Sequence, residues 1–149
     1  MTPVLHATET VREVMTCAPV TIRSETTVAE LEALMRSEGV ASCPVVDDHG
    51  ELVGMASRVD LLRALRPSRE LCVKDPAEVG RLQVRDIMRA GVVTVEPDDP
   101  LVAALDLIVD TRLHALPVVH RGPGRPVVVG VVTQGDLLSH FMSRRKGEP

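Results

Sequence analysis

An internal repeat constrains the fold of this chain more than any other feature of its sequence. VREVM at residues 11–15 returns as VRDIM at 84–88, PVTI at 19–22 as VVTV at 92–95, and CPVV at 43–46 as LPVV at 116–119. GMASRVDLL at 54–62 returns as GVVTQGDLL at 130–138. The second copy is three residues longer than the first before this block, and the extra residues fall in the Gly/Pro loop 120–126. Surface loops tolerate insertions at little cost. Blocks repeated in one order predict two copies of one structural unit.

Each copy has the pattern of a strand, a helix, two strands and a helix. Short β segments are expected at 20–22 and 92–95, then strands at 44–46 and 52–55 or at 117–119 and 127–132. The first helix of each copy has apolar residues at helical spacing: Val28, Leu31, Leu34 and Met35, or Leu101, Ala104, Leu105 and Ile108. The closing helices begin at Ser57 and Thr133. A mixed α/β (α+β) fold follows, with two β-α-β-β-α repeats packed as a pseudo-twofold pair.

Local signals refine these elements. Thr27 followed by Glu30 has the form of a capping box. Asp99 before Pro100 predicts an N-cap followed by proline at the first helical position. The run VVVGVV at 127–132 lacks alternation, which predicts a strand buried on both faces.

The repeats define the expected organisation of the chain. Repeat 1 covers residues 11–64, a connector with two prolines and several charges covers 65–83, and repeat 2 covers 84–142. Residues 143–149 form a flexible basic tail. The length of 149 residues suits one compact domain or two small halves that share one core.

Composition excludes several classes of partner. Aromatic residues make up 1% of the chain, so the usual platform for stacking unpaired bases is missing. The net charge is −4 and the basic run at 144–146 is best read as a solvated terminus, so we expect no nucleic-acid partner. No run approaches the ~20 apolar residues of a membrane span, so no membrane partner is expected.

The cysteines and the N-terminus indicate a compartment. Cys17, Cys43 and Cys72 are odd in number and form no CxxC pair, which predicts neither a zinc site nor a disulfide framework. The chain also begins without the pattern of a signal peptide. A soluble, cytoplasmic protein is therefore expected.

The repeated motif, TQGD at 133–136 and SRVD at 57–60, has two interpretations. As a capping box, Ser or Thr accepts from a backbone N–H and the acid bonds back, although Asp is shorter than the usual Glu or Gln. As a ligand grip, the helix N-terminus favours a phosphate, and the carboxylate accepts hydrogen bonds from the two hydroxyls of a ribose. A duplicated cap would give the same pattern, so the motif alone leaves both open.

The blocks VREVM…VTI and ASCPVVDDHGELVGMASRVDLL, with their second copies, resemble tandem CBS domains, also called a Bateman module. The resemblance covers about residues 11–64 and 84–142. Its most specific parts are the ending G-h-h-[ST]-x-x-D-h-h, in which h is apolar, and the P-V-V strand. The fold of that family is the β-α-β-β-α pair expected above.

The resemblance implies adenosine-containing ligands (AMP, ATP, NAD or S-adenosylmethionine) bound in clefts between the repeats. One repeat supplies an apolar slot for adenine, and the other supplies Ser or Thr and Asp. By position, one site would combine Thr16, Val20, Val40, Ala41 and Pro44 with Thr133 and Asp136. The other would combine Arg89, Val93, Leu113, His114 and Pro117 with Ser57 and Asp60. Both base slots have small aliphatic walls.

Several single residues have two readings. His114 is either a buried, satisfied histidine or a contact to base or phosphate. Arg58 is either an exposed surface charge or a phosphate contact, and Gln134 at the equivalent position cannot supply charge, so the two sites could differ in phosphate preference. Cys43, like Met15 and Met88, is expected in the core.

The expected function is a non-catalytic regulatory module. The chain has no GxGxxG after a strand, no P-loop and no HExxH, and no nucleophile, base and orienting group converge. We expect no attached effector domain, so a regulated partner would be another protein or another copy. We expect a homodimer formed through the helices. The alternative is a dimerising scaffold whose degenerate clefts stay empty.

Overall fold

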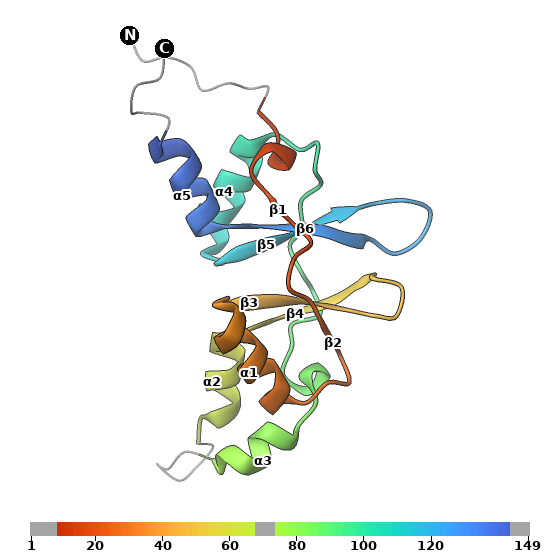
Figure 1. Cartoon of the computed structure of the whole chain (residues 1–149), viewed down its shortest axis with the longest axis vertical. Helices are drawn as coiled ribbons and strands as arrows, with labels where there is room; N and C mark the ends of the chain where they lie inside the picture. Colours follow the sequence, from red (N-terminus) through yellow and green to blue (C-terminus); the bar gives the residue numbers. More distant parts are fainter. Residues whose placement is uncertain (1–8, 68–73, 144–149) are drawn as a thin grey trace. The chain divides into compact units, whose positions relative to one another are not determined.

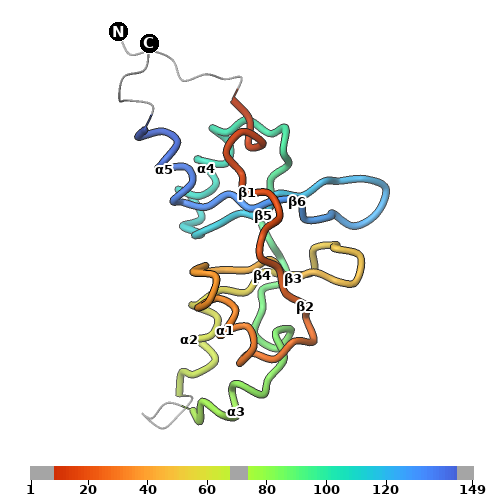
Figure 2. The backbone as a smooth tube through the Cα atoms, in the orientation of Figure 1, coloured from red at the N-terminus to blue at the C-terminus, as the bar shows by residue number. Residues whose placement is uncertain are grey.

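The computed structural model describes residues 9–67 and 74–143 and divides them into two compact units (Figures 1 and 2). Unit 1 contains residues 9–19 and 93–143, and unit 2 contains residues 20–92 apart from 68–73. Each unit therefore includes the opening segment of the other repeat, VREVM in unit 1 and VRDIM in unit 2. Residues 68–73 of the expected connector, with Cys72, and residues 144–149 of the expected tail lie outside the described residues.

Unit 2 has the predicted order of elements. They are β2 (Ile22–Arg23), α1 (Val28–Glu38), β3 (Ser42–Val46), β4 (Leu52–Ser57) and α2 (Arg58–Leu65), followed by α3 (Pro76–Arg81) and a 3₁₀ turn (Val84–Asp86). Strand β3 lies in the middle of the sheet, parallel to β2 and antiparallel to β4. Helix α3 was missed within the connector, although Asp75 before Pro76 is a helix-start signal.

Unit 1 repeats this arrangement with one difference. Its elements are a 3₁₀ turn (Val11–Glu13), β1 (Thr16–Cys17), α4 (Leu101–Thr111), β5 (Ala115–His120), β6 (Val127–Thr133) and α5 (Gln134–Ser143). Strand β6 pairs with β1 and β5, both antiparallel. The strand expected at 92–95 is reduced to one parallel bridge between Val95 and Val118. In Figure 1, α4 and α5 lie beside each other at one end of this sheet.

Two predictions about local structure are wrong. Strand β6 is not buried on both faces: Gly130 and Val132 are buried but Val127 is 36% exposed, because in this antiparallel sheet the two faces of β6 are unequally covered. Helix α4 begins one residue later than expected, with Pro100 rather than Asp99 at the N-cap. The Asp99 carboxylate instead accepts a hydrogen bond from the Glu96 amide, at 2.8 Å.

Other local predictions are confirmed. The N-cap half of the predicted Thr27 capping box is present at the start of α1: the Thr27 hydroxyl oxygen accepts from the Glu30 amide at 3.2 Å, while the Glu30 carboxylate accepts from the Thr27 hydroxyl at 3.0 Å. Cys43 is fully buried, and burial raises the pKa of its thiol to about 11. The thiol therefore stays protonated at neutral pH and packs as a small apolar group.

Each unit has its own apolar core. Leu31, Met35 and Val45 are among the buried residues of unit 2, with Met88 packed against them. Leu101 and Leu116 are fully buried in unit 1, where Met15 packs against the core. Within the part of the chain described here, no helix has the length and apolarity needed to cross a bilayer.

The glycines that open the repeated motif are required by close backbone approach. A Cβ on Gly130 would lie 2.9 Å from the Thr16 carbonyl oxygen, and one on Gly54 would lie 2.8 Å from that of Arg89. A methyl group at either position would push apart two paired backbone segments. Steric demand from these segments thus explains why both copies begin with glycine.

We expect Gly54→Ala and Gly130→Ala each to lower the free energy of unfolding by about 1–3 kcal/mol, the usual cost of overpacking. The matched control is Gly91→Ala, since a Cβ there has no atom within 4 Å. Urea unfolding measures all three variants. Equal stability of Gly130→Ala and Gly91→Ala would contradict this reading of the motif.

Candidate functional site

In unit 2 the repeated motif forms a closed capping box at the start of α2. The Asp60 carboxylate accepts from the Ser57 amide at 2.8 Å and from the Ser57 hydroxyl at 2.9 Å, both at Oδ2. The Ser57 oxygen in turn accepts from the Asp60 amide at 3.3 Å. Aspartate, although shorter than Glu or Gln, therefore closes the box.

Asp60 also holds two arginines. Its other oxygen, Oδ1, lies 2.8 Å from Nη1 of Arg63 and 3.5 Å from Nε of Arg89. The Asp60 side chain is 1% exposed, whereas those of Arg63 and Arg89 are 46% and 51% exposed. Both carboxylate oxygens are therefore engaged by protein, beneath two guanidinium groups that reach solvent.

The equivalent box in unit 1 has a different environment. The Asp136 Oδ2 accepts from the Thr133 amide at 3.0 Å, and the Thr133 hydroxyl oxygen accepts from the Asp136 amide at 3.0 Å. Asp136 is half-buried, and no hydrogen bond from any described residue reaches its Oδ1. Thr16 and Ser139 stand where Arg89 and Arg63 stand in the first copy. Asp136 thus keeps an available acceptor.

Backbone bonds bring further predicted residues to each motif. The amide of Arg58 donates to the carbonyl of Ala41 at 3.0 Å, and that of Gln134 to the carbonyl of His114 at 2.9 Å. The Gln134 side-chain amide also donates to the Leu113 carbonyl at 2.9 Å. The imidazole of His114 is exposed, so its reading as a buried histidine is wrong.

The remaining predicted residues take varied positions. Exposed Thr16 pairs with Val131 between β1 and β6, so it lies in the same unit as Thr133. The half-buried apolar residues pack against the two cores: Val20 and Val40 in unit 2, Val93 in unit 1. Pro44 and Pro117 are fully buried within β3 and β5. The combination of residues from both repeats into two clefts stays a prediction.

Arg63 is a polar residue of the site that the repeated motif does not include. It lies three residues after Asp60, and charged residues at that spacing share a helix face. Its ion pair could thus have been predicted from the sequence. The convergence of Arg63 and Arg89 on one oxygen could not, because Arg89 is fixed by its backbone bonds to Met55.

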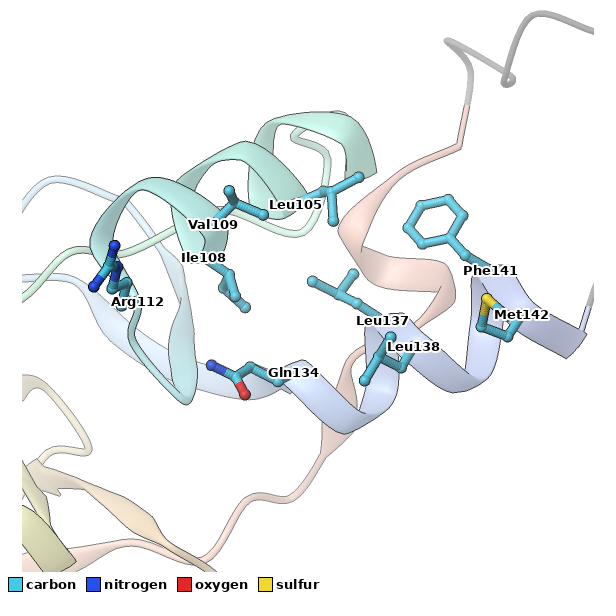
Figure 3. A pocket seen from close by; sticks show the side chains of 9 residues that line it. All are labelled: Leu105, Ile108, Val109, Arg112, Gln134, Leu137, Leu138, Phe141 and Met142. Atoms are coloured by element: carbon cyan, nitrogen blue, oxygen red, sulfur yellow. The ribbon is translucent and has the colours of Figure 1, made fainter. Parts of the chain in front are cut away.

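A second feature of unit 1 is an apolar groove between α4 and α5, with a volume of about 650 Å³. Leu105, Ile108 and Val109 of α4 face Leu137, Leu138 and Phe141 of α5, while Arg112 and Gln134 lie at one end and Met142 at the other (Figure 3). Val109, Leu138 and Met142 are 64%, 63% and 54% exposed. The groove is therefore a large apolar surface open to solvent.

The equivalent face of unit 2 is charged. Leu105 and Val109 correspond to Glu32 and Arg36, which form an ion pair at 3.0 Å along α1. Gln134 and Met142 correspond to the exposed Arg58 and Arg66 of α2 and its C-cap. The two copies of this face have thus diverged in polarity.

The duplicated β-α-β-β-α order and the two capped helices define a protein built from a tandem module. The sequence profile of the family described as "CBS domain" matches residues 11–67 and 84–143. The chain belongs to the CBS domain family.

Curated relatives agree with this assignment. The chain is 29% identical over 142 residues to "Uncharacterized protein MJ1404" of Methanocaldococcus jannaschii, covering 92% of this chain and 33% of that protein. It is 30% identical over 125 residues to inosine-5'-monophosphate dehydrogenase of Mycobacterium tuberculosis, covering 83% of this chain and 21% of the enzyme. The chain thus spans only a third or less of the length of these relatives.

Solved structures show the same fold. The CBS domain pair of protein MJ0100, in complex with 5'-methylthioadenosine and S-adenosyl-L-methionine, matches with a TM-score of 0.72 at 26% identity, covering 89% of this chain and 99% of that one. The structure of CBSX2 in complex with AMP matches with a TM-score of 0.75 at 25% identity, covering 92% and 98%.

Proposed function

We propose that this chain is a non-catalytic regulatory module that binds an adenosine-containing ligand, with Thr133 and Asp136 as its ribose-binding element. The Oδ1 of half-buried Asp136, to which none of the described residues donates a hydrogen bond, is the observation that carries the proposal. A carboxylate oxygen without a protein partner accepts hydrogen bonds from neighbouring ribose hydroxyls. The box fixes the other oxygen, so the acceptor is already oriented before a ligand arrives.

The similar structures support the class of ligand. MJ0100 is in complex with 5'-methylthioadenosine and S-adenosyl-L-methionine, and CBSX2 with AMP, so all three ligands share adenosine. AMP, ATP, NAD and S-adenosylmethionine are therefore the candidates for this chain. Which apolar base slot completes the Thr133 element remains a prediction from the family resemblance.

A thermal-shift assay tests the proposal. A ligand present at 100 times its dissociation constant is expected to stabilise the folded chain by about 2.7 kcal/mol. We expect such a shift with at least one of AMP, ATP, NAD and S-adenosylmethionine, and chromatography should recover the ligand unchanged. No shift with any of the four would overturn adenosine binding, and hydrolysis during the incubation would overturn the non-catalytic assignment.

A dimerising scaffold is the second candidate function, and the groove between α4 and α5 favours it. We propose that a second copy of this chain occupies the groove through the same face. A twofold interface places one patch against itself, so a mainly apolar patch with both a hollow and projecting side chains, and with Arg112 only at one end, is suited to it. The unit 2 face is unsuited, because Arg58 and Arg66 would oppose their own copies.

We expect Leu138→Glu to convert the dimer to a monomer at micromolar concentration, since each interface would then bury two unpaired carboxylates. Leu62→Glu is the matched control, because Leu62 holds the equivalent place on α2 and is 65% exposed. Light scattering after size-exclusion chromatography gives the mass of each variant. A dimer that survives Leu138→Glu but not Leu62→Glu would place the interface on unit 2.

A further inference from the structure

We infer that the two copies of the motif have divided their roles: Thr133 and Asp136 hold the ribose, whereas Asp60 positions Arg63 and Arg89 to bind a phosphate chain. The inference deepens the proposed function and rests on it for the nucleoside only. Asp60 is a positioning residue here, since both of its oxygens are already engaged within the protein.

The first argument is the satisfaction of Asp60. Its Oδ2 already accepts from the amide and hydroxyl of Ser57, and its Oδ1 lies against Arg63 and Arg89, so a ribose would compete with these groups for the carboxylate. The side chain is also 1% exposed, so no hydroxyl approaches it without movement of the residues above. Asp60 is therefore poorly placed to accept hydrogen bonds from ribose hydroxyls, the role proposed for Asp136.

The second argument is the free donor capacity of the arginines. A guanidinium has five N–H donors, and Arg63 and Arg89 each direct one nitrogen at Asp60. Their side chains are 46% and 51% exposed, so about half of each side-chain surface is open to an anion from solvent. Because both groups converge on one oxygen, they lie close enough to contact adjacent phosphates of one chain.

The third argument is the difference in charge between the copies. Arg58, Asp60, Arg63 and Arg89 carry a formal charge of +2, while the equivalent Gln134, Asp136, Ser139 and Thr16 carry −1. An anionic phosphate is attracted to the cluster with a charge of +2 and repelled by the cluster with a charge of −1. A phosphate chain is therefore favoured beside Ser57, and an uncharged or cationic adenosine derivative beside Thr133.

The geometry of Arg89 supports positioning by the fold rather than by chance contact. Its backbone exchanges two hydrogen bonds of 2.9 Å with Met55 of β4, which places its side chain over Asp60. The buried carboxylate then fixes the guanidinium, so little further side-chain entropy is lost when an anion binds.

The test is calorimetric titration of the full chain with tripolyphosphate, ATP and adenosine. We expect the wild type to bind tripolyphosphate, and Arg63→Gln and Arg89→Gln each to weaken it about tenfold, with adenosine affinity unchanged. Arg66→Gln is the control, because Arg66 is exposed just after α2 and belongs to no described ion pair. ATP shows whether a nucleotide or a free phosphate chain is the better ligand.

Asp60→Asn separates positioning from simple charge. The variant makes the cluster more positive, so tripolyphosphate would bind more tightly if the arginines supplied charge alone. Positioning by Asp60 predicts weaker binding instead, and Asp136→Asn should leave the tripolyphosphate affinity unchanged. A melting curve confirms that each variant is folded.

The outcomes distinguish the two proposals. Absence of tripolyphosphate binding to the wild type, or wild-type affinity for tripolyphosphate in both arginine variants, would overturn the divided roles. A wild type that binds tripolyphosphate but not adenosine would contradict the proposed function and would still support phosphate binding by Arg63 and Arg89.

Discussion

Asp60→Ala is expected to lower the free energy of unfolding by about 3 kcal/mol. The substitution removes a buried carboxylate that accepts from the Ser57 amide and hydroxyl and from Arg63, and that forms a longer ion pair with Arg89. Hydrogen bonds to charged groups contribute about 1.5–3 kcal/mol each, and removal of one partner from a buried ion pair is strongly destabilising. The arginines are half-exposed, so water compensates part of the loss.

The matched control for this prediction is Asp136→Ala. Asp136 closes the same box in unit 1 but pairs with no described arginine, so only the cap is lost, at about 1 kcal/mol. Urea unfolding of both variants gives the difference directly. Equal losses would show that the two arginines contribute nothing to the stability of unit 2.

Leu31→Ala is expected to cost about 2–5 kcal/mol. Leu31 is fully buried on α1 in the core of unit 2, and its truncation removes apolar contacts and leaves a cavity. The cost depends on how far the surrounding side chains collapse into the space. Denaturant unfolding followed by circular dichroism measures it.

Leu62→Ala is the control for the core prediction. Leu62 lies on the neighbouring helix α2 but is 65% exposed, so its loss should change stability by less than about 0.5 kcal/mol. A similar loss in both variants would mean that the contact between α1 and the sheet does not form the core of unit 2.

The repeat made most of the fold predictable from the sequence. Each apolar position expected on the first helix of a copy lies on an observed helix, and every expected strand except the one at 92–95 is present. The errors are the helix α3 missed in the connector and the details of boundaries and edges. Pro100 at the N-cap of α4 and the one-sided burial of β6 depend on what packs nearby, which periodicity does not report.

The candidate site was predictable in its residues but not in their roles. The Ser57 and Thr133 motifs were identified as caps and as ligand grips, and the caps are confirmed. The difference between Asp60 and Asp136 arises from Arg89, whose position depends on backbone pairing with Met55 far away in sequence. A contact of that range requires the fold itself.

The availability of Asp136 to a ribose is the central claim, and calorimetric titration with adenosine and 2',3'-dideoxyadenosine tests it most directly. The two compounds differ only in the hydroxyls that Oδ1 would accept from. We predict that the wild type binds adenosine at least tenfold more tightly, and that Asp136→Ala removes the difference. Equal affinity of the wild type for both compounds, or no binding of either, would contradict the account.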